Sequence, residues 1–507
     1  MFERIAFVAY EPWETRVAHT ILEKLAGNPK AAHTLVVADP YHPVNTNAWA
    51  ALHDMTDGAS HRTEVVFRDL LDWQHQIRHA DPADVTKRLD SISTNQKIEN
   101  MSALLRSDVH LTPRERQPYY WSLTENERRA AALLVIERVI EILDLVRPDA
   151  IVMMKDQYLV KNAVAALARG RHIPMRVFRR ARYRDYLKLD YFFLPLEPES
   201  ARSLEAPKKM KKVRDSVSRF EKSLYPTNLA VQKADFIQLC RSDPVAAAIQ
   251  TLKGGVHRQR RFQRKQRKKV RVPETSALRY WVSRSRRVRW WMVFRTARTL
   301  RYIFDRWTLA REERIPENYV LVPLHNRPEA TILTRGYGID DEDVVASVIR
   351  ALERLNTDTA CVVLEHPSMI ADRRYSFYRK LRRHGRVIFV DPTVPTQDLI
   401  RKAKGLVTVS GTAGLEASLA GVPVHLAGYP EYLPVIASSG FQNIPSFVEA
   451  CVSGTAPASR DAVVSYLERH CYDGWEGELA VGSTTSEEAL NAMADTLVDM
   501  LEASAPR

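Results

Sequence analysis

The stretch LVTVSGTAGLEASLAGVP, residues 406–423, decides the fold class of this chain. A short apolar run, 406–409, stops at a turn of small residues, 410–414, and an Ala-rich helical pattern follows at once. A glycine and a proline end that pattern, and a strand-like run begins at Val424. The helix of such a βαβ unit starts with unpaired backbone N–H groups at the positive end of its dipole. The turn is therefore typical of an anion site, most simply one for phosphate.

Alternating strand and helix patterns continue on both sides of this unit. In the first part we expect strands at 5–10, 33–38, 63–67, 149–154 and 173–178, and helices at 15–26, 125–146 and 159–169. In the second part we expect strands at 319–324, 360–365, 386–391, 405–409 and 422–426, and helices at 341–354, 374–383, 396–403 and 412–420. Repeated βαβ units predict an α/β protein with two Rossmann-like domains facing a cleft.

The patterns divide the chain into four segments. We expect an N-terminal α/β domain at 1–240, a basic and mainly helical insertion at 241–315, a C-terminal α/β domain at 316–480 and a C-terminal helix at 481–507. The apolar fraction of 45% is that of an ordinary globular protein. The N-terminus lacks the apolar region of a secretory leader, and the most apolar long stretch, 405–424, has strand-turn-helix punctuation. These features predict a cytoplasmic protein.

The spacing of the cysteines and the distribution of charge bear on the kind of site and partner that the chain has. The four cysteines are scattered without CxxC spacing, which indicates reduced core residues and neither a disulfide framework nor a zinc site. The chain carries +14 in all, but 253–311 holds 20 Lys and Arg against two acids, a net of +18, so the remainder is −4. The basicity belongs to one segment.

That basic segment also contains regularly spaced aromatic residues. Between Val288 and Trp307 apolar side chains recur on one helical face, and arginines flank it. Trp and Arg at an amphipathic border are typical of contact between 280–311 and an anionic membrane surface. Packing of the same face into the protein is an equally good interpretation. Nucleic-acid binding fits less well, because the chain has no RNP, KH or zinc signature.

Two polar segments follow strands of the second part. Glu365-His366-Pro367 ends the strand at 360–365, because Pro367 cannot continue a central ladder. His366 then lies at the carboxyl edge of the sheet, where it can donate a hydrogen bond to a phosphate oxygen or simply be a surface histidine. The polar turn after the strand at 319–324 contains Glu329 and reaches the same edge, or is an ordinary loop.

The small-residue turn offers several ligand groups. Ser410 and Thr412 can contribute hydroxyls, and Gly411, Ala413 and the residue after it can contribute backbone N–H groups. Glu416, in the first helical turn, can accept a hydrogen bond from a sugar hydroxyl or serve only as a favourable charge near the helix N-terminus. The alternative for the whole turn is tight helix–strand packing.

The order of these motifs resembles a known family. The segments are HNRPEAT (325–331), EHP (365–367), SGTAGLEA (410–417), GVPV (421–424) and GYPEY (428–432). In order and spacing they resemble the capsule polysaccharide synthesis family, GT-B glycosyltransferases related to bacterial Kdo and sialic acid transferases. The resemblance covers about 318–435. It implies that His366, Pro367, Ser410, Gly411 and Thr412 hold the phosphate and ribose of a nucleotide sugar, often a CMP-sugar.

The chemistry expected from this resemblance needs an acid and a base. His366 and the helix N–H groups stabilise the leaving phosphate, and a carboxylate of the other domain takes the proton of the acceptor hydroxyl. Glu11, Asp39 and Asp156 each follow an N-terminal strand and are the candidates, with Glu11 and Asp156 as the first choices. The alternative for each is a cap or a surface acid. No acidic cluster indicates a metal site, so we expect a metal-independent enzyme whose nucleotide sugar is a substrate and which needs no cofactor.

The sequence thus predicts a peripheral glycosyltransferase at the inner face of the plasma membrane. It would add a sugar to a glycan or lipid-linked glycan of a capsule or other surface polysaccharide. Kdo or a related acidic sugar is the first candidate for that sugar. Two alternatives stay open. One is another GT-B enzyme such as a nucleotide-sugar epimerase. The other is a non-catalytic protein that binds membrane or nucleic acid through a degenerate GT-B domain.

Overall fold

The structure is a computed structural model. It describes residues 3–9, 12–25, 32–37, 61–66, 70–98, 100–107, 124–154, 159–180, 186–191, 245–253, 314–326, 341–366, 375–390, 394–430, 432–436, 443–473 and 475–476, and isolated positions at 215, 243, 296–297, 299–301, 339, 369, 373, 491 and 495. Most of the basic segment lies outside the described residues. So do five of the predicted site residues, Glu11, Asp39, Asp156, Glu329 and Pro367.

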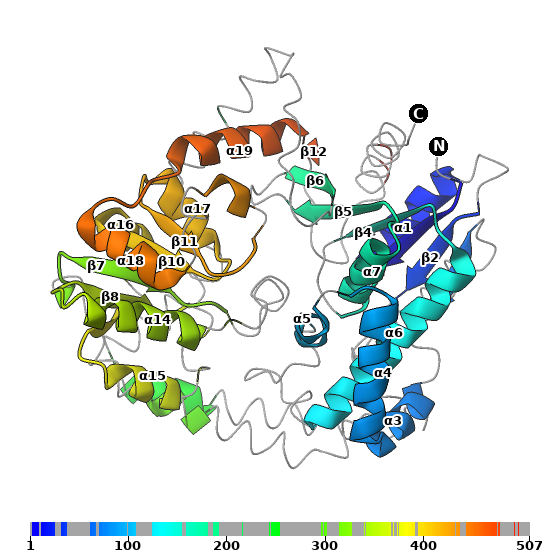
Figure 1. Cartoon of the computed structure of the whole chain (residues 1–507), viewed down its shortest axis with the longest axis horizontal. Helices are drawn as coiled ribbons and strands as arrows, with labels where there is room; N and C mark the ends of the chain where they lie inside the picture. The colour runs from blue at the N-terminus through cyan, green and yellow to red at the C-terminus, as the bar shows by residue number, and fades with distance from the viewer. Residues whose placement is uncertain are drawn as a thin grey trace.

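The first α/β unit is built on one seven-stranded sheet (Figure 1). Its strands are β1 (Ile5–Ala9), β2 (Thr34–Val37), β3 (Arg62–Val65), β4 (Ala150–Met154), β5 (Met175–Arg180), β6 (Tyr186–Tyr191) and β12 (Trp475–Glu476). The order β3-β2-β1-β4-β5 is parallel throughout, and β6 and β12 extend it antiparallel. This is the Rossmann order, which changes direction between β1 and β4.

Helices connect the strands of this sheet. They are α1 (Pro12–Leu25), α3 (Leu70–His79), α4 (Pro82–Asn95), α5 (Met101–Arg106), α6 (Glu125–Val146) and α7 (Leu159–Gly170). Helix α6 begins at a capping box, in which the Thr124 side chain accepts from the N–H of Glu127 and the Glu127 side chain accepts from the N–H of Thr124. Its apolar positions are buried in a core shared with α4 and α7, so the long helical pattern at 125–146 is confirmed.

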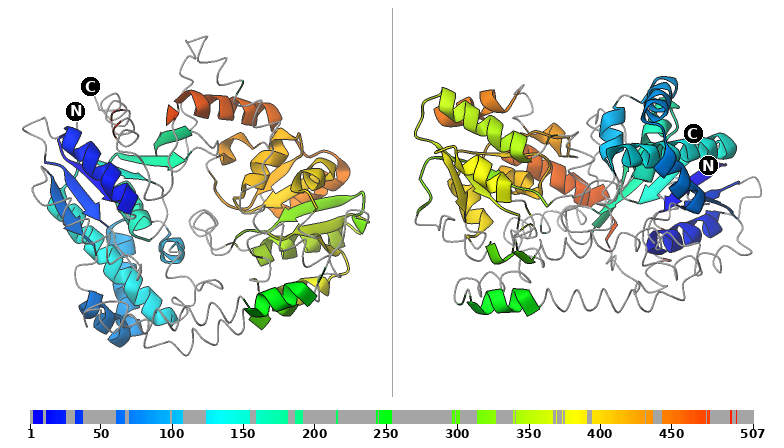
Figure 2. Two further views of the ribbon diagram at one scale, coloured as in Figure 1. Left: turned by 180° about the vertical axis from the view of Figure 1, so that it is seen from behind. Right: turned by 90° about the horizontal axis from the view of Figure 1, so that it is seen from below.

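The second α/β unit repeats the same plan with five parallel strands. They are β7 (Tyr319–Pro323), β8 (Ala360–Leu364), β9 (Val387–Val390), β10 (Gly405–Thr408) and β11 (Val424–Leu426), in the order β11-β10-β7-β8-β9. The helices are α14 (Asp341–Arg354), α15 (Tyr375–Arg382), α16 (Thr396–Lys402), α17 (Thr412–Leu419), α18 (Ile444–Ser453) and α19 (Arg460–Asp473), with a 3-10 turn η6 (Leu433–Val435). Figure 2 shows this unit and the first as separate bodies in both views.

The single sheet of the second unit is buried on both faces. Side chains of alternate parity along each strand enter two different cores, one with α16, α17 and α19 and one with α14 and α18. The strands therefore read as continuous apolar runs, which is typical of parallel sheets. Among the residues that the structure describes, no helix combines the length and apolar character needed to cross a membrane.

The prediction of two Rossmann-like units is confirmed, and most element bounds agree within two residues. The antiparallel strands β6 and β12 were not predicted. Through β12, the chain returns from α19 to the first sheet, where Trp475 pairs with Leu187. A two-residue strand has no readable periodicity, so its partner is fixed only by the fold.

Candidate functional site

The second sheet has a topological switch point between β7 and β10. Strand β7 pairs with β8 on one side and with β10 on the other, always in parallel. Its crossovers leave in opposite directions there, and ligands of open α/β sheets bind beyond the carboxyl ends of the strands at such a point. The segments that follow β7, β8 and β10 contain His325, His366 and Ser410, so parts of the three motifs meet at one sheet edge.

His325 joins the first of these segments to the third. Its ring is buried, and Nδ1 lies 2.7 Å from Asp341 Oδ1. On the other side of the ring, Nε2 lies 3.1 Å from Thr408 Oγ1 and accepts from the backbone N–H of Ser410 at 3.4 Å. Because an N–H can only donate, Nε2 is the acceptor and the ring proton is on Nδ1, directed at Asp341. His325 therefore fixes the position of the small-residue turn.

Arg373 joins the first segment to the second. Its guanidinium contacts Glu365 through Nε at 2.8 Å, Asp341 at 3.1 Å and the backbone carbonyl of His325 at 2.9 Å. Glu365 also accepts from the Tyr378 hydroxyl and from the backbone N–H of His366. All three charged groups of this His325–Arg373 network are buried, so the three loops are held by interactions that solvent does not screen.

The charges of the network stabilise one another. Burial by itself lowers the pKa of Arg373, but the carboxylates of Glu365 and Asp341 outweigh it and raise that pKa above its usual range. The arginine thus stays charged under all ordinary conditions. One cation between two carboxylates leaves the buried scaffold with net negative charge, so it cannot itself be the anion site. The anion-binding groups must lie outside it.

The first turn of α17 has those groups. Gly411 is the N-cap residue with extended backbone, and it makes no side-chain cap hydrogen bond. The carbonyl of Gly411 accepts from the N–H of Gly414 and from the Tyr432 hydroxyl. The N–H groups of Thr412 and Ala413, at the positive end of the helix, have no acceptor within the helix. Thr412 is exposed and Ala413 half-buried, so this end faces outward.

The glycines of the turn are required by close packing. A Cβ added at Gly411 would lie 3.1 Å from Thr408 Oγ1 and 3.2 Å from His325 Nε2. One added at Gly414 would lie 2.8 Å from the Tyr432 hydroxyl. All three distances are shorter than ordinary contacts, so the alternative of tight packing describes part of what this turn does.

The described site residues divide into inner and outer groups. Ser410 is buried, and its N–H is used by His325. His366, Gly411 and Glu416 are half-buried and Thr412 is exposed. The backbone of His366 donates to Glu365 and accepts from Met369 at 2.7 Å. Their roles toward a ligand stay predictions, as do those of Pro367, Glu329, Glu11 and Asp156.

Sequence comparison gives one family. Residues 237–434 match the model of a family described as capsule polysaccharide biosynthesis protein. The resemblance is confirmed. The family segment is about two fifths of the chain and contains β7 to β11 with the entire His325–Arg373 network. No functionally curated protein has a significant sequence match to the chain.

Several solved structures are similar to the chain at low identity. A β-Kdo 2,7 transferase, KpsC of Thermosulfurimonas dismutans, has 13% identity over 72% of this chain and 90% of its own, with a TM-score of 0.28. The β-Kdo 2,4 transferase of the same protein has 13% identity over 63% and 87%, with a TM-score of 0.31. UDP-GlcNAc 2-epimerase from Neisseria meningitidis has 11% identity over 99% and 100%, with a TM-score of 0.22. Scores this low carry no argument about function.

Sequence reasoning missed Asp341 and Arg373 in the family segment. Asp341 begins α14, where an acidic residue is favourable at the helix N-terminus. Its second role, holding His325, has no local signal. Arg373 is one arginine among many, and only its contact with Glu365 from the EHP motif identifies it. Tyr432, by contrast, belongs to the quoted GYPEY motif.

The first unit has its own switch point, between β1 and β4, and a buried ion pair lies there. Glu14, in the first turn of α1, contacts Lys161 Nζ with both carboxylate oxygens at 2.9 and 2.7 Å. Neither side chain is more than 1% exposed. Both residues lie on apolar helical stripes, where a charged residue is the sequence signal that was overlooked. The fully buried pair links the first turns of α1 and α7 inside the first unit.

Proposed function

We propose that the chain is a GT-B glycosyltransferase that moves a sugar from a nucleotide-sugar donor to a capsule or other surface polysaccharide. A CMP-activated acidic sugar such as Kdo is the first donor to test. One observation carries the proposal. The family segment brings the loops of the HNR, EHP and SGTAG motifs together at the switch point between β7 and β10, beside an outward-facing helix N-terminus.

In this proposal the donor phosphate binds at the first turn of α17. The N–H groups of Thr412 and Ala413 and the imidazole of His366 stabilise the negative charge that grows on the leaving phosphate. Glu416 accepts from a hydroxyl of the nucleotide sugar. The His325–Arg373 network does not touch the donor. It holds the three loops in place, so that little reorganisation is needed during the reaction.

The acceptor hydroxyl needs a base from the first unit. Glu11 and Asp156 follow β1 and β4, the two strands at that unit's switch point, and either would deprotonate the hydroxyl as it attacks the anomeric carbon. The bond from that carbon to the donor phosphate breaks in the same step, and the nucleotide leaves with the electron pair. In this proposal the acceptor glycan lies at the cytoplasmic side of the membrane. The basic segment would contact that membrane surface.

A thermal-shift panel of CMP-, UDP-, GDP- and TDP-sugars tests donor binding. A donor at a hundredfold its dissociation constant adds about 2.7 kcal/mol to the free energy of unfolding. We expect one nucleotide class to raise the melting temperature of the wild type and of His384→Ala, but not that of His366→Ala. His384 is a matched control, because it is also half-buried but precedes β9 at the opposite edge of the sheet.

Nucleotide release then separates the reaction classes. A transferase releases free nucleotide only when a glycan acceptor is present, whereas an epimerase converts the sugar without one. A full melting-temperature response to a nucleotide sugar in His366→Ala would show that the donor does not bind at this site. No response to any of the four nucleotide classes in the wild type would contradict the proposal as a whole.

A further inference from the structure

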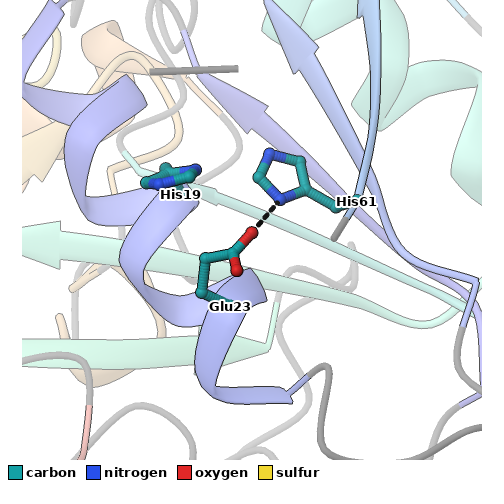
Figure 3. A group of neighbouring side chains, drawn as sticks. All are labelled: His19, Glu23 and His61. Carbon is teal, nitrogen blue, oxygen red and sulfur yellow. Dashed lines mark hydrogen bonds and ion pairs between the residues drawn. The ribbon is translucent and has the colours of Figure 1, made fainter. Parts of the chain in front are cut away.

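Three potential metal ligands converge in the first unit (Figure 3). His19 and Glu23 are four residues apart on α1, so their side chains lie on one helix face. His61 directly precedes β3, at the amino edge of the sheet. The proposed donor site lies at the carboxyl edge of the other sheet, and the acceptor base is expected at the carboxyl edge of this one. The cluster therefore has no part in the proposed transfer.

The geometry of the cluster fits one small cation. Each residue offers one ligand atom, and these three atoms all lie within 4.8 Å of one another. His61 Nδ1 lies 3.0 Å from Glu23 Oε1, and the two imidazole rings are 5.1 Å apart between centroids. Ligand atoms of a tetrahedral zinc ion with bonds of about 2.0 Å are about 3.3 Å apart. Small side-chain rotations close that difference.

An unsatisfied nitrogen in the cluster indicates a missing ligand. The buried Nδ1 of His19 has no hydrogen-bond partner among the described residues. His61, whose side chain is only 1% exposed, faces Glu23 through Nδ1, so its Nε2, which also lacks a described partner, cannot bind the same ion. Buried polar atoms without a partner cost free energy, which favours a water or an ion beside His19. Figure 3 shows the two rings and the carboxylate close together, with His61 joined to Glu23.

We propose that His19, Glu23 and His61 bind one first-row transition-metal dication, with zinc as the best-matched ion. Two imidazoles and one carboxylate are a common zinc ligand set, which leaves the fourth position for water. The carboxylate offsets half of the ion's charge. Bound there, the ion would clamp the C-terminal half of α1 to the start of β3 and so stabilise the edge of the first sheet.

Calorimetric titration of the full, EDTA-treated chain with zinc chloride tests this site. We expect one equivalent to bind and to raise the melting temperature. In Glu23→Gln and in His61→Ala the affinity should fall about tenfold or more, which is the range seen even for outer-shell partners. Glu23 has a side chain 39% exposed, so its conservative replacement keeps the fold and preserves the test if His61→Ala does not fold.

A second histidine pair gives the matched control. His75 and His79 are four residues apart on α3, both exposed, with ring centroids 4.5 Å apart. We expect the His75→Ala/His79→Ala double variant to bind zinc as the wild type does. The proposal is overturned by an absence of saturable zinc binding. It is also overturned if binding is lost in that double variant, or if Glu23→Gln retains full affinity.

Discussion

At the scale of single residues, the candidate site depends on groups that do not touch a ligand. His325, Asp341, Glu365 and Arg373 have their polar atoms directed at one another and at the backbone of neighbouring loops. Each loop that reaches the donor site is therefore tied to a second loop by a buried bond. Loss of one member leaves the others with uncompensated charge or hydrogen-bonding groups.

Arg373→Gln tests this dependence. The change leaves the carboxylates of Glu365 and Asp341 buried without their cation, so we expect a loss of about 3–5 kcal/mol in the free energy of unfolding. Urea unfolding followed by tryptophan fluorescence measures it. Arg379→Gln, on the exposed side of α15, is the control and should change stability by less than about 0.5 kcal/mol. Equal unfolding midpoints for the two variants would show that the network contributes nothing.

At the scale of elements, packing of a helix directly against a strand sets the position of the site. Strand β10 begins at Gly405, where α18 lies against the backbone. A Cβ at this position would lie 2.3 Å from Cys451 Sγ and 3.3 Å from the Phe447 ring. The glycine therefore lets α18 approach β10, which carries the small-residue turn at its other end. Burial raises the pKa of the Cys451 thiol to about 12, so the thiol is neutral in this contact.

A double-mutant cycle checks that contact. We expect Gly405→Ala to cost about 1–3 kcal/mol of stability, because the added methyl group overlaps the Cys451 sulfur. In a Cys451→Ala background the same substitution should cost clearly less, since the sulfur is gone. Gly385→Ala is the matched control, because nothing lies within 4 Å of its added Cβ. Identical costs for Gly405→Ala in both backgrounds would contradict the structural explanation.

At the scale of the whole molecule, two units with the same strand order are combined with one very basic segment. Each unit has a switch point between its first and fourth strand in its own chain order, and the pairing of β12 with β6 returns the chain to the first sheet. The net charge of +18 over 253–311 is a separate property, which neither sheet requires. It is the part of the chain suited to an anionic surface.

Vesicle sedimentation tests the proposed membrane contact. We expect the full chain to sediment with vesicles rich in phosphatidylserine at low salt, to be released as salt rises, and to ignore phosphatidylcholine vesicles, because the attraction is about 1 kcal/mol per basic residue near the lipid and is screened. Replacing the six flanking arginines at 287, 289, 295, 298, 301 and 306 by glutamine should weaken sedimentation and lower the salt concentration that releases the chain. Unchanged binding in that variant, or equal binding to both lipids, would contradict the contact.

The local sequence pattern was sufficient to predict much of the secondary structure of this protein. The apolar runs, the helical spacing at 125–146 and 341–354 and the small-residue turn after β10 are all set by neighbours within a few residues. For that reason the two α/β units, most of their element bounds and the three loops of the candidate site could be predicted from the sequence. Parallel strands also have their carboxyl ends at one edge, which predicted that the loops share an edge.

Contacts between distant residues were decided only by the tertiary structure. His325 and Ser410 are 85 positions apart, and Glu14 and Lys161 are 147 apart. The pairing of β12 with β6 and the approach of His61 to His19 and Glu23 are of the same kind. Side-chain periodicity predicts which face of an element is buried. It does not predict which charged group of another element contacts that face. His325, and not His366, holds the small-residue turn because of the strand order. His325 follows β7, which neighbours β10, whereas His366 follows β8, which does not.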